Sequence, residues 1–231
     1  MDRLEEFTTW IVEKGLDLSA PSLRADSVSE SLLNSLVKGG QRTLTIAPET
    51  GSQELRNRMH KGLDDEDILH AAKLAESAGI RYLKLYFIIG LPTEADEDVE
   101  AISTLVQRIT ESTNLIVTVS VNPFIPKANT TLQRSPQPPL EEVRRKLKIV
   151  ESGLKSVSRA DFEALDPRSA RIQAALSLGE ESTGEVIVAA SKYGGLAGWR
   201  RAEREMRTDF FSLANDDERL QGDLPWAFIQ T

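Results

Sequence analysis

Residues 81–94 read RYLKLYFIIGLPTE, and this stretch decides the expected fold. Nearly every side chain from residue 85 to residue 91 is apolar, and Gly90 and Pro92 then interrupt the run. A short, continuous apolar run is typical of a strand in a parallel sheet that is covered on both faces. Acidic residues at 96–98 suit the first turn of a following helix. The stretch therefore predicts a buried strand, a turn and a helix.

The same order of strand, turn and helix recurs on both sides of this stretch. We expect three further strands, at residues 22–24, 43–47 and 115–121. Full helices between strands imply right-handed crossovers and a parallel sheet. An open doubly wound sheet and a part of a (β/α) barrel both fit this pattern. In either architecture the ligand site lies at the carboxyl ends of the strands.

The composition of the rest of the chain indicates two domains. Prolines gather between residues 126 and 140, which predicts an extended connection and a domain boundary. Residues 1–135 would form the α/β domain, with about four parallel strands. Residues 136–231 would form a mostly helical C-terminal extension.

Charge and residue content exclude several classes of protein. The 231-residue chain has a formal net charge of −8, so we expect no broad surface for nucleic acid. It contains no cysteine, so it cannot by itself hold an iron–sulfur cluster in thiolate ligands. No apolar run approaches the roughly 20 residues of a membrane span, and no signal peptide is visible. These features predict a cytoplasmic protein without a membrane partner.

Polar side chains stand at the end of the strand at residues 43–47. Glu49 could accept hydrogen bonds from a ligand, and the helix that begins near Ser52 could hold an anionic group. An equally good interpretation is that Ser52 caps this helix and that Glu49 offsets its dipole.

Three other residues at strands have both a functional and a structural interpretation. Arg24 could bind a ligand carboxylate, or it could form an internal salt bridge to Asp26 or Glu49. Lys84 would face the barrel interior or mark the exposed start of its strand. Gly90 would let backbone groups approach a flat ligand such as adenine, although an ordinary turn explains the same residues.

The remaining charged clusters point to structure rather than to chemistry. The acidic runs at 64–67 and 96–98 lie where first helical turns are expected, so we do not interpret them as metal ligands. The basic residues that we expect on a solvated face are Arg42, Arg56, Arg58 and Lys61.

Several segments, taken in order, resemble the second half of a radical S-adenosylmethionine (radical SAM) enzyme. The resemblance is closest to the branch associated with cobalamin domains and extends more distantly to the methylthiotransferases. The segments that carry it are PSLRAD at 21–26, TLTIAPETGS at 43–52, LR at 55–56, KG at 61–62, KLYFIIGLPTE at 84–94, NPFIPK at 122–127, DPR at 166–168 and LPW at 224–226.

This resemblance implies a partial (β/α) barrel of the TIM type. In the family, a 4Fe–4S cluster held by a CxxxCxxC loop binds and reductively cleaves S-adenosylmethionine, which yields a deoxyadenosyl radical. Position in the motifs assigns ribose and carboxylate contacts to Ser22 and Arg24. The residues assigned to the rest of the cofactor are Glu49 and Ser52 beside it, and Ile89, Gly90 and Leu91 around the adenine.

The chain departs from the family pattern in its missing cluster loop and in its missing glycine-rich segment for the methionyl amine. We therefore expect the cofactor- and substrate-binding part of an enzyme, which is not competent alone. The cluster would come only with a missing N-terminal half, and cobalamin only with a separate domain.

The expected partner is the missing N-terminal half-barrel, or another chain, along the edge of the first strand. The helix at 4–14 is a further candidate to cover this edge. Two alternatives remain open: a degenerate scaffold module with the same fold, and a cluster-independent (β/α) enzyme that uses Glu49 or Lys84. No motif identifies the substrate.

Overall fold

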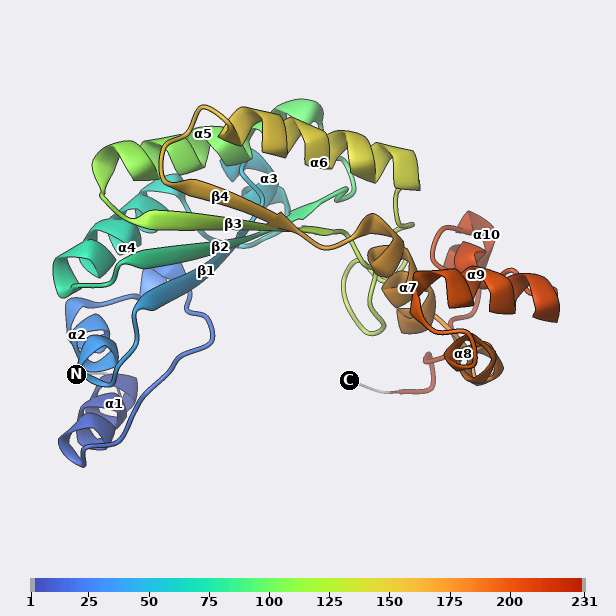
Figure 1. Cartoon of the computed structure of the whole chain (residues 1–231), viewed down its shortest axis with the longest axis horizontal. Coiled ribbons are helices and arrows are strands. Elements are labelled where there is room, and N and C mark those ends of the chain that lie inside the picture. Colours follow the sequence, from blue (N-terminus) through green and yellow to red (C-terminus); the bar gives the residue numbers. More distant parts are fainter. Residues whose placement is uncertain (1–2, 230–231) are drawn as a thin grey trace. The chain divides into compact units, whose positions relative to one another are not determined.

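Four strands form one parallel sheet in the order β1-β2-β3-β4 (Figure 1). The structure is a computed structural model that describes residues 3–229, so the outermost residues of the two predicted domains lie outside it. Neighbouring strands in the sheet are also neighbours in the chain, as expected for successive β-α units. The strands are β1 (Thr43–Glu49), β2 (Tyr82–Ile89), β3 (Ile116–Pro123) and β4 (Ala160–Ala164).

The structure differs from the prediction at the first strand and at the last strand of the sheet. Residues 22–24 form only an isolated bridge, between Leu23 and Ile46, because the chain turns immediately into the short 3-10 helix Ala25–Ser27. The fourth strand is instead β4, which lies in the region predicted to be helical. Strand β4 was missed because its sequence, ADFEA, is short and has no continuous apolar run.

The chain divides into two compact units. The first, which we call the sheet unit, contains the described residues through Ile89 together with Glu94–Asn122 and Lys146–Ala164. The second, the helical unit, contains Gly90–Thr93, Pro123–Arg145 and the described residues from Leu165 onward. The sheet unit thus takes residues from beyond position 135, and the predicted domain boundary at that position stays a prediction.

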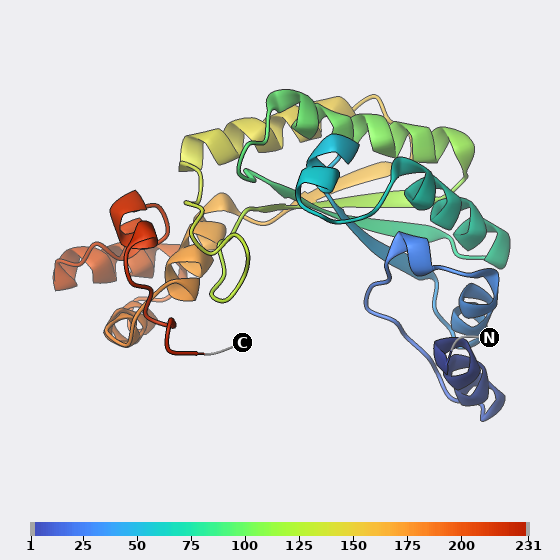
Figure 2. The same cartoon turned by 180° about the vertical axis from the view of Figure 1, so that it is seen from behind.

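The helices of the sheet unit cover one face of the sheet, as Figures 1 and 2 show from opposite sides. Along β2, Leu83, Leu85 and Phe87 are fully buried on this face, whereas Lys84 and Tyr86 on the other face are partly exposed. The expectation that both faces are covered is therefore wrong for this unit. The expectation failed because Tyr86 and other side chains of β2 that face the open side are apolar, so the sequence alone suggests that they belong to a buried core. The covering helices are α3 (Gln53–Arg58), α4 (Asp65–Ala78), α5 (Asp96–Ser112) and the part of α6 (Leu140–Leu154) that begins at Lys146.

One covered face and one open face decide between the two architectures. A doubly wound sheet has helices on both faces, whereas the inner face of a (β/α) barrel carries none. The sheet unit is therefore part of a (β/α) barrel of the TIM type. Its open face corresponds to the barrel interior.

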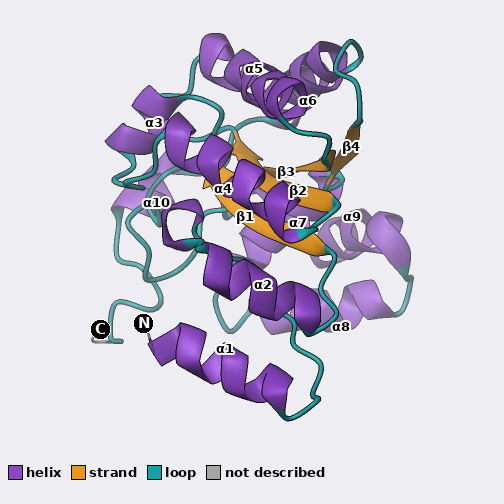
Figure 3. Ribbon diagram, turned by 90° about the vertical axis from the view of Figure 1, so that its left-hand side faces the viewer, coloured by secondary structure: helices purple, strands orange, loops and turns teal. Residues whose placement is uncertain are grey.

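Two helices precede β1. Ser29 caps α2 (Glu30–Lys38) by accepting a hydrogen bond from the backbone N–H of Leu32. Helix α1 (Arg3–Glu13) packs on α2, and Figure 3 shows α2 between α1 and the sheet. Three large apolar side chains of α1 remain exposed, namely Leu4, Phe7 and Trp10, with Phe7 at 57%.

The helical unit confirms the mostly helical character of the C-terminal region. Asp166 caps α7, and two apolar clusters hold the helices together, one around Phe210 and the other around Leu178 and Trp226. No helix within residues 3–229 is long and apolar enough to cross a membrane. The helices of this unit are α7 (Pro167–Ser177), α8 (Thr183–Ser191), α9 (Gly195–Met206), the 3-10 helix Phe210–Ser212 and α10 (Asp217–Gln221).

Candidate functional site

Strand β1 ends in an irregular geometry at Glu49. The pairing register with β2 shifts between Ile46 and Glu49, and Glu49 has a φ angle of 72°. A β-bulge changes the direction of the side chains that follow it, and residues other than glycine rarely adopt a positive φ angle. Such outliers are often found at functional sites. The bulge makes Glu49 a stronger candidate than its sequence position alone suggests.

Lys61 holds the Glu49 carboxylate in place. Its Nζ lies 2.8 Å from Oε1 of Glu49, and both side chains are about a quarter exposed. The backbone oxygens of Lys61 and Gly62 also accept hydrogen bonds from the Arg24 guanidinium, at 3.3 and 3.2 Å. The loop at Lys61 therefore links two of the predicted cofactor residues, and the prediction that Lys61 is merely solvated is wrong.

Arg24 forms the internal salt bridge that the sequence left open. Its Nε and Nη2 atoms donate to the two carboxylate oxygens of Asp26, at 3.0 and 2.7 Å. This pair lowers the pKa of Asp26 and raises the pKa of Arg24. The partner is Asp26 rather than Glu49, and Ser22, two residues earlier, is exposed.

Ser52 serves as a helix cap. Its hydroxyl accepts a hydrogen bond from the backbone N–H of Leu55, at 3.2 Å, and so begins α3. This is the structural alternative that the sequence offered. Contact of Ser52 with a cofactor stays a prediction.

Arg56 is completely buried, so its assignment to a solvated face is wrong. Its guanidinium donates to the backbone oxygens of Leu63 and Thr50, at 2.9 and 2.8 Å, and pairs with Asp65. Asp65 also pairs with Arg108, at 2.6 Å. Sequence periodicity could not reveal this role, because α3 has only six residues. Arg56 ties the loop after β1 to the start of α4.

Gly51 allows this loop to lie close to α5. A Cβ atom at this position would lie 2.1 Å from the backbone nitrogen of Ile102. Gly51 is therefore needed for the close approach of this loop to α5. Only glycine fits here without movement of the backbone.

The residues predicted around an adenine lie at the end of β2. Ile89 is fully buried and Leu91 is 5% exposed, so only their backbone groups would be available to a ligand. Gly90 has a φ angle of 80°, and a Cβ there would lie 2.5 Å from Cγ of Pro138. The close approach that Gly90 permits is made by a proline of the same unit. An adenine contact here stays a prediction.

An ion pair crosses the open face of the sheet. Nζ of Lys84 lies 2.5 Å from Oε1 of Glu163, and it lies 5.2 Å from the ring centroid of Tyr86. Hydrogen bonds from Lys84 and then Ser120 lower the pKa of Glu163, and Glu163 raises the pKa of Lys84. Lys84 thus points into the barrel interior, as one of its two interpretations expected. Glu163 was missed because β4 was missed.

A buried ion pair joins Glu94 to α6. Nζ of Lys146 on α6 lies 2.8 Å from Oε2 of Glu94, and the two side chains are 4% and 1% exposed. Lys146 also donates to the backbone oxygen of Glu94, at 3.1 Å. The acidic runs have structural roles as well, since Asp67 and Asp98 accept backbone hydrogen bonds at the starts of α4 and α5.

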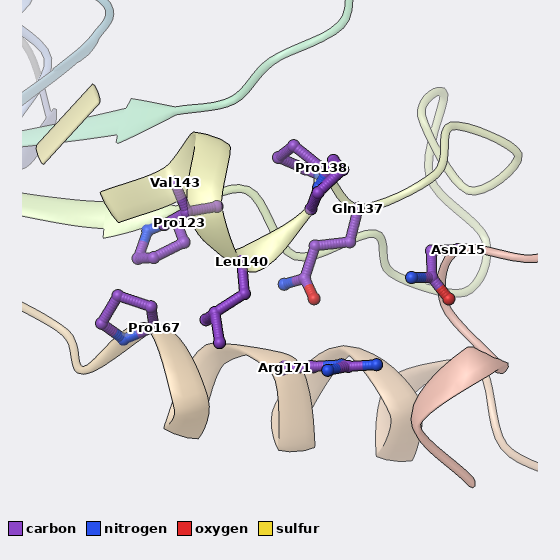
Figure 4. A pocket seen from close by; sticks show the side chains of 9 residues that line it. Pro123, Gln137, Pro138, Leu140, Val143, Pro167, Arg171 and Asn215 are labelled. Atoms are coloured by element: carbon purple, nitrogen blue, oxygen red, sulfur yellow. The ribbon is translucent and has the colours of Figure 1, made fainter. Parts of the chain in front are cut away.

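The helical unit contains a cavity of about 160 Å³, shown in Figure 4. Prolines such as Pro138 and Pro167 form much of its wall, and Arg171 of α7 and Gln137 contribute polar groups. The Gln137 amide nitrogen donates to the backbone oxygens of Phe124 and Ala170, at 2.9 and 3.3 Å. These bonds hold the proline-rich segment against α7. The sequence had suggested only an extended connection here.

Comparison with known proteins identifies the family. Residues 10–106 match the model of the radical SAM superfamily. The chain is 34% identical over 187 residues to an uncharacterized protein of Methanocaldococcus jannaschii, which is 79% of this chain and 39% of the relative. Residues 10–106, which include β1, β2 and Glu49, are therefore part of a radical SAM superfamily domain.

Two further relatives match shorter stretches. An uncharacterized methyltransferase of Pyrococcus horikoshii is 33% identical over 92 residues, which is 39% of this chain and 20% of that protein. A protein of M. jannaschii provisionally named as a methylthiotransferase is 33% identical over 82 residues, or 36% of this chain and 18% of that protein. The chain thus spans about two fifths or less of the relatives that it matches.

The superfamily in general uses S-adenosylmethionine and a 4Fe–4S cluster. The polar atoms around Glu49, Lys61 and Arg24 suit a polar, charged cofactor. The cluster does not fit, because the 231 residues include no cysteine thiolate to ligate iron.

Proposed function

We propose that this chain is the cofactor- and substrate-binding part of a radical SAM enzyme. The observation that carries the proposal is the bulge at Glu49, whose carboxylate and the neighbouring Arg24 are held at one edge of a barrel-type sheet within the family match. Ser22 and Arg24 would contact the ribose and carboxylate of S-adenosylmethionine. Glu49 and Ser52 would lie beside the cofactor.

The adenine would rest on the backbone of residues 89–91. Ile89 and Leu91 have buried side chains, so Gly90 and the peptide groups on either side of it would supply the hydrogen bonds. The open face of the sheet would line the substrate cavity. Lys84 and Glu163 would then meet the substrate from that face.

The proposal assigns the cluster to another part of the enzyme. When bound together, the cluster and S-adenosylmethionine supply a deoxyadenosyl radical in this superfamily. This chain contributes binding and orientation, and it is not competent alone. An N-terminal half-barrel, or another chain, would add to the edge beside Leu23, cobalamin would require a separate domain, and we expect a cytoplasmic location.

Two alternatives make different demands on the same residues. A degenerate scaffold module would keep the fold and bind no cofactor. A cluster-independent enzyme would need Glu49 or Lys84 as an acid–base group. For this enzyme Lys84 is a poor choice of base, because Glu163 raises the pKa of Lys84, and Glu49 remains the candidate group.

The first test measures binding of S-adenosylmethionine to the chain by calorimetry. Removal of the charge in Glu49→Gln should weaken binding about tenfold, since hydrogen bonds to charged groups contribute about 1.5–3 kcal/mol. Glu100→Gln, an exposed residue of α5, is the matched control and should bind as the wild type does. Equal binding by all three proteins would contradict the assignment of Glu49.

The second test concerns the whole enzyme. The gene is expressed with any coding sequence that precedes the chain, iron and sulfide are reconstituted without oxygen, and release of 5′-deoxyadenosine from S-adenosylmethionine is measured. We expect release from the longer protein and none from the 231 residues alone. Absence of both binding and release would favour the scaffold alternative.

A further inference from the structure

Three arginines line a second cavity in the helical unit, with a volume of about 130 Å³. Arg168 and Arg171 come from α7, and Arg200 comes from α9. No aspartate or glutamate is among the residues that line it, although the chain has 36 acidic and 28 basic residues. The cavity is therefore positively charged within an acidic protein.

The three arginines differ in their partners. Arg168 is paired with Asp166, at 2.6 Å, and this bond lowers the pKa of Asp166 to about 2. Arg168 is thus neutralised. Neither Arg171 nor Arg200 has a carboxylate within ion-pair distance among residues 3–229. These two cations carry the positive charge of the cavity.

Arg171 is held in place by an aromatic ring. Its guanidinium carbon lies 5.0 Å from the centroid of the Phe211 ring. Stacking on a ring satisfies the flat face of a guanidinium and leaves its N–H groups at the edge available for an anion. Phe211 is itself part of a buried apolar cluster with Ile172. Arg171 is therefore positioned before any ligand arrives.

The remaining wall of the cavity is apolar. Ile172, Leu196 and Phe211 line it, and the same cluster packs these residues against one another. Arg171 and Leu140 also line the 160 Å³ cavity of Figure 4, so Arg171 belongs to both cavities. A ligand that suits this environment has an anionic end and an apolar body.

We propose that this cavity binds a small organic anion, a phosphate monoester or a carboxylate with an apolar or aromatic group. Its charged oxygens accept hydrogen bonds from Arg171 and Arg200, since guanidinium groups bind phosphate and carboxylate in a bidentate manner. Its apolar part lies on Ile172, Leu196 and Phe211. The site shares no residue with the proposed cofactor site, and the inference stands even if the proposed function does not.

The test is calorimetric titration of the full chain with three probes: phenyl phosphate, benzoate and inorganic phosphate. We expect an aromatic anion to bind at least fivefold more tightly than inorganic phosphate, because of the apolar wall. Preference for phenyl phosphate over benzoate would assign the site to phosphate esters, and the reverse would assign it to carboxylates. Failure of both aromatic anions to bind would overturn the proposal.

Variants locate the bound anion. Arg171→Gln and Arg200→Gln should each weaken binding at least tenfold, whereas Arg204→Gln, an exposed arginine of α9 that does not line the cavity, should leave it unchanged. Thermal melting establishes that each variant is folded. Arg200 is exposed, so Arg200→Gln decides the question if Arg171→Gln does not fold. Wild-type affinity in Arg200→Gln would contradict the proposal.

Discussion

At the carboxyl edge of the sheet, Arg24 and Lys61 have carboxylate partners in Asp26 and Glu49. In the second cavity of the helical unit, Arg171 and Arg200 have no such partner within the part of the chain that the structure describes. In the sheet unit, ion pairs and carbonyl contacts hold three loops near the ends of the strands. In the helical unit, an aromatic ring orients Arg171 instead. The cations at the sheet edge are thus held by carboxylates before any cofactor binds, whereas we propose that those of the cavity receive their anionic partner from a ligand.

The strongest test of a structural role is Arg56→Met. The substitution leaves Asp65 without its buried partner and leaves the backbone oxygens of Leu63 and Thr50 without a donor. We expect a loss of about 3–5 kcal/mol in the free energy of unfolding, as for other broken buried ion pairs. Urea denaturation of the full chain measures it.

The matched control for Arg56 is Arg42→Met. Arg42 is exposed and donates to the backbone oxygens of Val37 and Gln41. Its loss should change the free energy of unfolding by less than about 1 kcal/mol. Similar effects for both variants would mean that burial of Arg56 does not distinguish it.

A smaller effect is expected from Gly51→Ala. The added methyl group would lie within 3 Å of backbone atoms of Ala101 and Ile102, so the loop or α5 must move. Overpacking of this kind lowers the free energy of unfolding by about 1–3 kcal/mol. Thermal melting of the variant provides the measurement.

Gly184→Ala in the helical unit is the matched control for Gly51→Ala. Nothing lies within 4 Å of a Cβ at Gly184, which belongs to α8. Alanine should be neutral or stabilise the chain by up to about 1 kcal/mol, because it is the better helix former. If Gly51→Ala were as well tolerated as Gly184→Ala, the close approach to α5 would not constrain the loop.

The smallest effect is expected from the ion pair between Asp166 and Arg168, an arginine that lines the second cavity. The pKa of Asp166 is about 2 in the folded chain, below its ordinary value of 3.8, so its ionised form stabilises the fold above pH 4. This contribution is lost as the pH falls from about 4 to about 2. Since both side chains are more than a third exposed, we expect less than about 1 kcal/mol.

Asp166→Asn measures this contribution. The difference in unfolding free energy between wild type and variant should be present at pH 5 and should shrink as the pH falls toward 2. The asparagine Oδ1 can still accept the backbone hydrogen bond that caps α7, so little difference should remain at that pH. A difference that does not change with pH would contradict the ion pair.

Much of the sheet could be predicted from local sequence. The apolar run of β2 and the β-branched residues of β1 are local features, and each strand was expected within two residues of its observed ends. The strand at residues 22–24 and strand β4 were misjudged because both are short segments at sheet edges. Pairing partners, rather than local pattern, decide whether such segments become strands.

For a related reason, the sequence predicted some residues of the candidate site and not their partners. Glu49, Arg24 and Ser52 lie at or just after the ends of expected strands, so their neighbourhood at the sheet edge could be expected from chain order. Asp26 was one of two partners expected for Arg24, but Lys61 and Glu163 could not be selected from among the other charged residues. A charge pair depends on distances of 3 Å, and residues such as Lys84 and Glu163 are far apart in the chain.

The sequence by itself determined the parallel α/β class, the resemblance to the radical SAM superfamily and the lack of cysteine ligands for a cluster, because these depend on local patterns and on residue identity. Only the tertiary structure decided that one face of the sheet is open, that Arg56 is buried and that Arg171 and Arg200 line one cavity. Burial and charge pairing arise when segments distant in the chain come together, so they follow from the packing of the whole fold.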